Sequence, residues 1–60
     1  MKIGDKVKML KTIPTANGTL YQGDRGKIDE ILMLGKLRVI DTMGRIWYVR
    51  KTDVKVISSL

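Results

Sequence analysis

The chain has 60 residues, with 12 Lys or Arg, six Asp or Glu, and a formal net charge of +6. It contains no Cys and no His, so it lacks disulfides, thiolate or imidazole metal ligands, and the usual general base of enzymes. This composition predicts a non-enzymatic domain with no metal site and no cofactor, and the positive charge makes polyanions and acidic proteins the first candidate partners.

The hydropathy of the chain is typical of a globular protein. Apolar residues make up 43% of the chain, which is ordinary for a globular protein. No apolar run approaches the roughly 18 residues of a membrane-spanning helix, and the first residues lack the apolar segment of a signal peptide. We therefore expect a cytoplasmic protein with one domain over residues 1–57 and a frayed tail over residues 58–60.

The first predicted strand lies within residues 1–11. Its residues alternate between an apolar set and a basic set, namely Ile3, Val7 and Met9 against Lys6 and Lys8. This period of two predicts apolar side chains on one face and lysines on the other. Residues 12–24 contain Pro14 and show no sustained period, so they predict a long, irregular hairpin loop with Asn17-Gly18 at its tip.

Two glycines, Gly23 and Gly26, precede a strand predicted over residues 26–34. We expect them to hold backbone angles that residues with a Cβ resist. Ile28 and Ile31 cannot both face inward under strict alternation, which predicts a bulge near Glu30. Without a bulge, Glu30 and the preceding aspartate point to opposite faces and form no paired-carboxylate site.

The third predicted strand covers residues 37–42, with Leu37, Val39 and Asp41 on one face, and a turn at Gly44 leads into a fourth over residues 45–49. Alternation allows only one of Trp47 and Tyr48 to enter the core. We expect Tyr48 inside and Trp47 partly exposed, while the alternative, Trp47 as the core aromatic of a chain without Phe, stays open.

The C-terminal segment predicts a 3₁₀ turn over residues 51–54 and a short last strand over residues 55–57. Three aspartates stand where turns are expected, and we interpret them as turn caps rather than metal ligands: Asp5, Asp24 and Asp53.

Two groups of residues carry a family resemblance. Gly4-Asp5-Lys6-Val7 followed by Gly23-Asp-Arg-Gly26-Lys-Ile28 resembles the KOW motif, and Gly44-Arg-Ile-Trp-Tyr-Val49 followed by Thr52-Asp53-Val54 is similar to the end of small SH3-like barrels. The resemblance implies an all-β, five-stranded SH3-like barrel with a long first hairpin loop and a 3₁₀ turn before the last strand, a fold found in ribosomal and transcription-elongation domains and in small phage or bacterial proteins. The insertion at about residues 11–20 departs from the KOW pattern.

Aromatic and basic residues are close together in the sequence and form the candidate binding set: Tyr21, Arg25, Lys27, Arg38, Arg45, Trp47 and Arg50. Aromatic rings beside guanidinium groups suit both protein hot spots and single-stranded nucleic acid. We favour a protein partner, an acidic one, for a small regulator or inhibitor, because the basic residues are dispersed along the strands. RNA or single-stranded DNA is the alternative.

Overall fold

Seven strands and two 3₁₀ turns make up the fold in the computed structural model, which describes residues 1–58. In chain order they are β1 (Lys6–Met9), β2 (Ile13–Thr15), β3 (Gly18–Leu20), β4 (Arg25–Ile31), η1 (Met33–Gly35), β5 (Lys36–Asp41), β6 (Ile46–Arg50), η2 (Lys51–Asp53) and β7 (Val54–Ser58). No helix in this part of the chain has the length and apolar character needed to cross a membrane.

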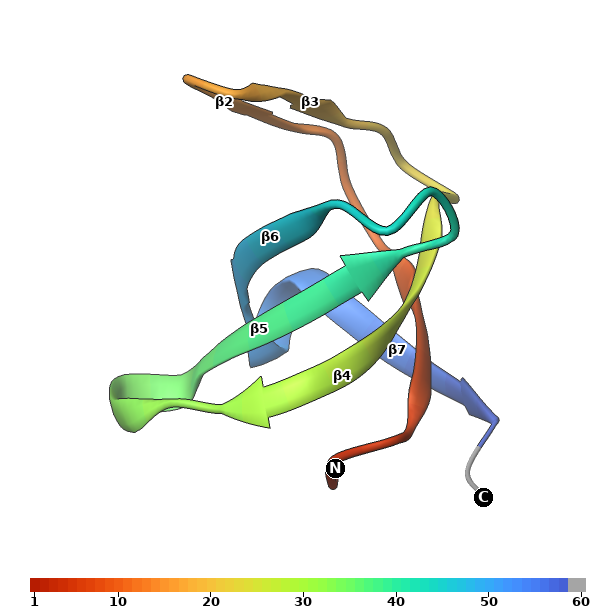
Figure 1. Ribbon diagram of the computed structural model, residues 1–60, viewed down its shortest axis with the longest axis vertical. Helices are drawn as coiled ribbons and strands as arrows, with labels where there is room; N and C mark the ends of the chain where they lie inside the picture. Colours follow the sequence, from red (N-terminus) through yellow and green to blue (C-terminus); the bar gives the residue numbers. More distant parts are fainter. Residues whose placement is uncertain (59–60) are drawn as a thin grey trace.

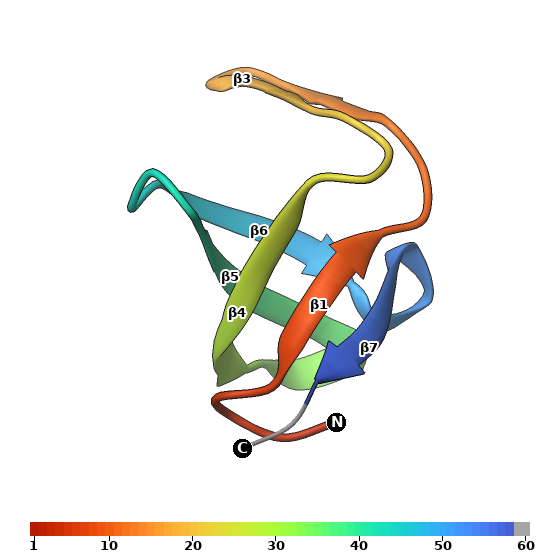
Figure 2. The same ribbon diagram turned by 90° about the vertical axis from the view of Figure 1, so that its right-hand side faces the viewer.

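The strands form two antiparallel sheets. Five strands make one sheet in the order β6-β5-β4-β1-β7, and β2 pairs with β3 in the other. The larger sheet curls, so that β4, β1 and β7 lie in front of β5 and β6 in Figure 2. The β2–β3 hairpin extends over β6 at one end of the sheet (Figures 1 and 2). The all-β prediction is therefore confirmed.

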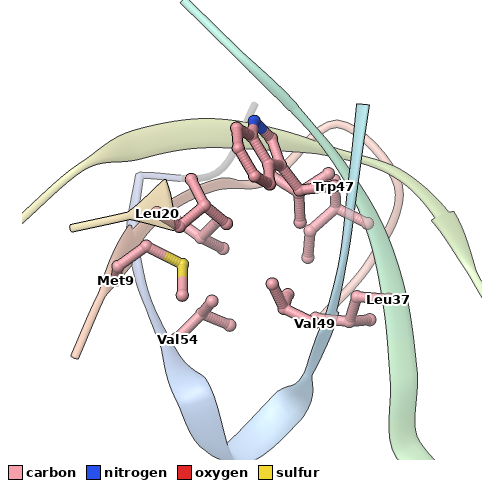
Figure 3. Close-up of a cluster of buried hydrophobic side chains, with 9 residues drawn as sticks. Met9, Leu20, Leu37, Trp47, Val49 and Val54 are labelled. Carbon is pink, nitrogen blue, oxygen red and sulfur yellow. The ribbon is translucent and has the colours of Figure 1, made fainter. Parts of the chain in front are cut away.

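The core lies inside the curl, where the inward residues of the large sheet meet Leu20 of the hairpin. Figure 3 shows Met9, Leu20, Trp47 and their neighbours pointing toward one another. The buried apolar residues are Val7, Met9, Leu20, Ile28, Leu37, Val39, Trp47, Val49 and Val54. Full burial of one such side chain stabilises a fold by roughly 1.5–3 kcal/mol.

The prediction that Tyr48 enters the core was wrong. Trp47 is 5% exposed and Tyr48 is 62% exposed. Trp47 pairs with Val39 and faces inward with Val49, and its Nε1 donates a hydrogen bond to Asp41 Oδ2 at 2.8 Å. A Trp can be buried where its N–H finds an acceptor, and Asp41 provides one on the same face of β5.

The segment predicted as a long, irregular loop is instead an ordered hairpin. β2 and β3 pair from Ile13↔Leu20 to Thr15↔Gly18, and Thr15 Oγ1 donates to the Gly18 carbonyl at 2.7 Å. Asn17 lies in the connecting turn, as expected. The Trp47 ring lies 3.5 Å from where a Cβ on Gly18 would stand, so the hairpin covers the indole.

The bulge in β4 is confirmed, but it does not bury Ile31. The register with β5 shifts between Ile28 and Glu30, which leaves Asp29 as the extra residue. Ile28 is 1% exposed and Ile31 is 39% exposed, because β4 ends at Ile31 beside the η1 turn instead of continuing to residue 34. Ile3, also expected inside, is exposed because β1 begins only at Lys6.

The two neighbouring glycines serve different purposes. Gly23 has a φ of +92°, as predicted for a tight turn. Gly26 does not have a positive φ; instead, a Cβ there would lie 2.6 Å from Val39 Cγ1 and 2.8 Å from the Ile40 carbonyl oxygen. Close approach of β4 and β5, rather than a special backbone angle, therefore requires Gly26.

All three aspartate caps are confirmed. Asp5 Oδ2 accepts from Lys2 N–H at 3.0 Å, Asp24 Oδ2 from Tyr21 N–H at 2.9 Å, and Asp53 Oδ2 from Arg50 N–H at 3.1 Å. At the C-terminal end, Ser58 pairs with Lys6 and belongs to β7, so the prediction of a frayed tail is wrong for residue 58. The rest of that predicted tail, residues 59–60, lies outside the described residues.

Candidate functional site

Five cations occupy the outer surface of three adjacent strands, and we call this surface the basic face. Within the sheet, Lys6 lies opposite Lys27, and Lys8 lies opposite both Arg25 and Lys55. These residues alternate with Val7, Ile28 and Val54, which point into the core, so their side chains project outward and all five are exposed. The basic face thus crosses β4, β1 and β7, the strands in the foreground of Figure 2.

The acidic residues of the chain are engaged elsewhere. Asp5, Asp24 and Asp53 cap turns. Asp41 accepts hydrogen bonds from Met43 N–H, Arg45 N–H and the Trp47 indole, at 2.8, 2.9 and 2.8 Å. Within residues 1–58, no member of the basic face forms an ion pair with a carboxylate. The basic face therefore carries uncompensated positive charge.

The remaining two acids converge on one arginine. Arg38 Nη2 lies 2.7 Å from Asp29 Oδ2 and 3.0 Å from Glu30 Oε2. The bulge turns these sequence neighbours toward the same side, contrary to strict alternation. The hydrogen bond to Asp29 and the two negative charges raise the pKa of Arg38 above its ordinary value. The Arg38 guanidinium group is thus engaged in ion pairs within the fold.

Two aspartates are held ionised by their hydrogen bonds. Burial alone raises the pKa of Asp53, but the Arg50 N–H and the Lys11 ammonium group, 3.1 Å from Oδ1, outweigh burial and lower it. In the same way, the Trp47 indole and two backbone N–H groups outweigh desolvation and lower the pKa of Asp41.

Like charges directly opposite each other on a sheet destabilise it. Placing Lys on an edge strand discourages aggregation, which is a structural explanation for Lys55 on β7. It does not explain Lys8, Arg25 or Lys27, because β1 and β4 each have a partner on both sides. Protection of an exposed edge therefore does not account for the concentration of charge on the interior strands.

A hollow of about 560 Å3 adjoins the basic face. Its lining combines three cations with apolar and hydroxyl groups: Lys6, Arg25, Gly26, Lys27, Ile40, Asp41, Thr42 and Ile57. In the described part of the chain, Asp41 is the one acidic residue of the lining, and both of its carboxylate oxygens already accept hydrogen bonds. Phosphate oxygens could approach these ammonium and guanidinium groups from the open side of the hollow.

The structure separates the residues predicted as one binding set. Arg25 and Lys27 belong to the basic face, and Arg50 lies at the far end of β6. Arg38 is ion-paired, and Trp47 is in the core. The other two are exposed beside turns: Arg45, whose N–H bonds to Asp41, and Tyr21, which is 62% exposed. The expected cluster of aromatic rings and guanidinium groups is not formed.

Sequence reasoning missed Lys6, Lys8 and Lys55 as site residues. The alternation of Lys6 and Lys8 with apolar residues was a usable signal for an outward lysine face. What was missing was the pairing that sets Lys55 and Arg25 on either side of Lys8, because β7 and β1 are far apart in the sequence.

Comparison with known proteins adds no relative. No protein-family model, no curated protein and no solved structure matches this chain significantly. The candidate site therefore stands on its geometry alone.

Proposed function

We propose that this protein is a non-enzymatic module with an open, SH3-like barrel that binds the phosphate backbone of nucleic acids through the basic face. The observation that carries the proposal is the cross-strand array Lys55–Lys8–Arg25 with Lys6–Lys27 beside it. Lysine and arginine side chains that neutralise phosphates release condensed counterions, and this supplies most of the affinity of sequence-independent binding.

Nucleic acid thus replaces the protein partner that we favoured from the sequence. That preference depended on basic residues being dispersed along the strands, and strand pairing gathers five of them on one surface. Their engagement with phosphates would also relieve the repulsion between directly opposed cations.

The composition of the face favours backbone contacts over reading of bases. Its members are lysines and one arginine, and none of the three aromatic residues is on these strands. Trp47 is buried, Tyr48 is on β6 at the opposite edge of the sheet, and Tyr21 is in the connection between β3 and β4. Base stacking on aromatic rings is what typically holds single strands. We therefore expect duplex DNA or structured RNA to bind at least as well as single strands, with little sequence preference.

Salt dependence tests this proposal. Five phosphate contacts on a duplex predict a slope of about −4.5 for log K against log salt, so raising NaCl from about 50 to 200 mM should weaken binding about 500-fold. Fluorescence anisotropy with a random-sequence duplex measures this slope. The double variant Lys6→Gln with Lys27→Gln should reduce the slope to about −2.7, because two contacts are lost.

A second cross-strand cationic pair provides the matched control. Lys36 lies opposite Arg50 at the far end of the sheet, so Lys36→Gln with Arg50→Gln removes the same charge away from the basic face. The proposal is refuted if this control reduces the slope as much as the first variant does, or if the wild-type protein shows no binding at about 50 mM salt.

A further inference from the structure

One edge of the large sheet, that of β6, is free. β6 is the last strand of the large sheet on one side, and no backbone hydrogen bond joins it to the β2–β3 hairpin within residues 1–58. Figures 1 and 2 both show the hairpin running above β6. An edge strand presents unpaired N–H and C=O groups and is a template for pairing with another chain.

A groove of about 470 Å3 lies between this edge and β2. Its apolar contributors come from both sides, with Ile13 and Pro14 on β2 and Tyr48 and Val49 on β6. The polar members of its lining are Lys11, Thr12, Lys36, Arg50 and Asp53. The groove is therefore both apolar and, with three cations against one aspartate, positively charged.

The charges that remain available in the groove are Lys36 and Arg50. Lys11 is ion-paired with Asp53, whereas Lys36 and Arg50 form no ion pair among residues 1–58 and lie directly opposite each other on β5 and β6. A ligand with carboxylates at this end of the groove would be attracted to both.

The two walls of the groove differ in what they offer to an incoming strand. β2 carries Pro14, which has no N–H to donate. On β6, the Arg50 N–H is already bonded to Asp53, but the edge before it has no partner in the hairpin. Pairing is therefore directed to the Ile46–Val49 part of β6, with β2 acting as an apolar wall.

We infer that the β6 edge is a strand-addition site for an extended, acidic segment of a partner protein. Main-chain hydrogen bonds to an exposed edge supply affinity in this mode, and pockets for alternate side chains supply specificity. Here the alternate apolar side chains would face the hairpin and pack on Ile13 and Val49, and the carboxylates between them would lie on the outer face and meet Lys36 and Arg50. A second copy of this chain is disfavoured as the occupant, because it would bring another net charge of +6.

The test uses an acetylated and amidated hexapeptide of alternating Glu and Val, titrated into the ¹⁵N-labelled full chain and followed by NMR. We expect amide shifts in β2, β6 and at Lys36, with little change in β1 and β7. Replacing Lys36 and Arg50 by Gln should weaken binding about three- to tenfold, the range expected from losing two exposed charge pairs. Lys6→Gln with Lys27→Gln should leave the affinity for this peptide unchanged.

Two N-methylated peptides separate strand addition from attraction by charge alone. Only one set of alternate N–H groups of an added strand faces β6. Methylation of that set should abolish binding, and methylation of the other set should be tolerated. The inference would be overturned if the two methylated peptides bound with the same affinity, or if a hexapeptide of alternating Lys and Val bound as tightly as the Glu-Val peptide. It would also be overturned if the Glu-Val peptide shifted only amides of the basic face. Displacement of the peptide by a short single-stranded oligonucleotide, or concentration-dependent shifts in β6 without peptide, would likewise overturn it, because these would assign the groove to nucleic acid or to a second copy.

Discussion

Replacing the central lysine of the basic face should stabilise the protein while weakening its binding to nucleic acid. Lys8 lies directly opposite Lys55 on one side and Arg25 on the other. Lys8→Glu turns two repulsive pairs into two attractive ones, and at about 0.3 kcal/mol per pair in each direction, near the lower end for exposed cross-strand pairs, the gain is about 1 kcal/mol. For a chain of 60 residues this corresponds to a rise in melting temperature of about 8 °C.

Thermal unfolding followed by circular dichroism at low salt measures this gain. Lys8→Gln removes only the repulsion and should give about half of it, and about 1 M salt should reduce both effects because the Debye length falls to about 3 Å. Lys51→Glu is the matched control, since it makes the same charge change on an exposed residue of η2; there we expect no more than about 0.5 kcal/mol. A Lys8→Glu variant that melts at or below the wild-type temperature would refute the charge-opposition argument.

Four further predictions follow from the packing and the turns. Gly26→Ala should lower the free energy of urea unfolding by about 1–3 kcal/mol, because its Cβ would meet Val39; an unchanged midpoint would contradict the close approach. Trp47 fluorescence should resist iodide quenching in the native protein and stay unchanged when nucleic acid binds, because the indole is buried. Leu34, which is 93% exposed with a φ of 60°, should accept Asn with a gain of about 0.5–1 kcal/mol, measured by urea unfolding, since Asn tolerates this conformation better. Asp53 has a lower pKa in the fold than in the unfolded chain, so the stability it contributes is present above about pH 4 and is lost as pH falls through the folded pKa. Between neutral and acidic pH, the free energy of urea unfolding should therefore fall less for Asp53→Asn than for the wild-type protein.

The elements that could be predicted are those determined by local chemistry. Asp24 and Asp53 cap turns because a carboxylate placed before or within a tight turn finds a backbone N–H a few residues away. The bulge near Glu30 was predicted so that Ile28 and Ile31 could both be buried; the bulge is present, but Ile31 is exposed. The pairing of β2 with β3 in the predicted hairpin loop of residues 12–24 was not predicted, because strands of three residues are too short to show alternation.

The orientation of the aromatic pair depended on a contact that periodicity does not reveal. Trp47 and Tyr48 alternate, so the choice between them is set by which ring finds both space and a hydrogen-bond acceptor. Asp41 supplies the acceptor from the neighbouring strand. A carboxylate predicted on the inward face of β5, together with a Trp on the next strand, was the available signal for burial of the indole.

The two proposed sites use the same kind of charge in different backbone settings, and this makes them separable. On the basic face, Lys8 stands on a strand whose backbone is paired on both sides, so a ligand there can reach only side chains. At the groove, Arg50 stands on an edge strand, so a ligand can use the main chain as well. Steep salt dependence is therefore expected of ligands on the basic face, where counterion release dominates, and a weaker dependence of peptides on β6, where main-chain hydrogen bonds contribute. If removing either pair of cations weakened both ligands equally, net charge alone would explain the binding, and neither surface would be a distinct site.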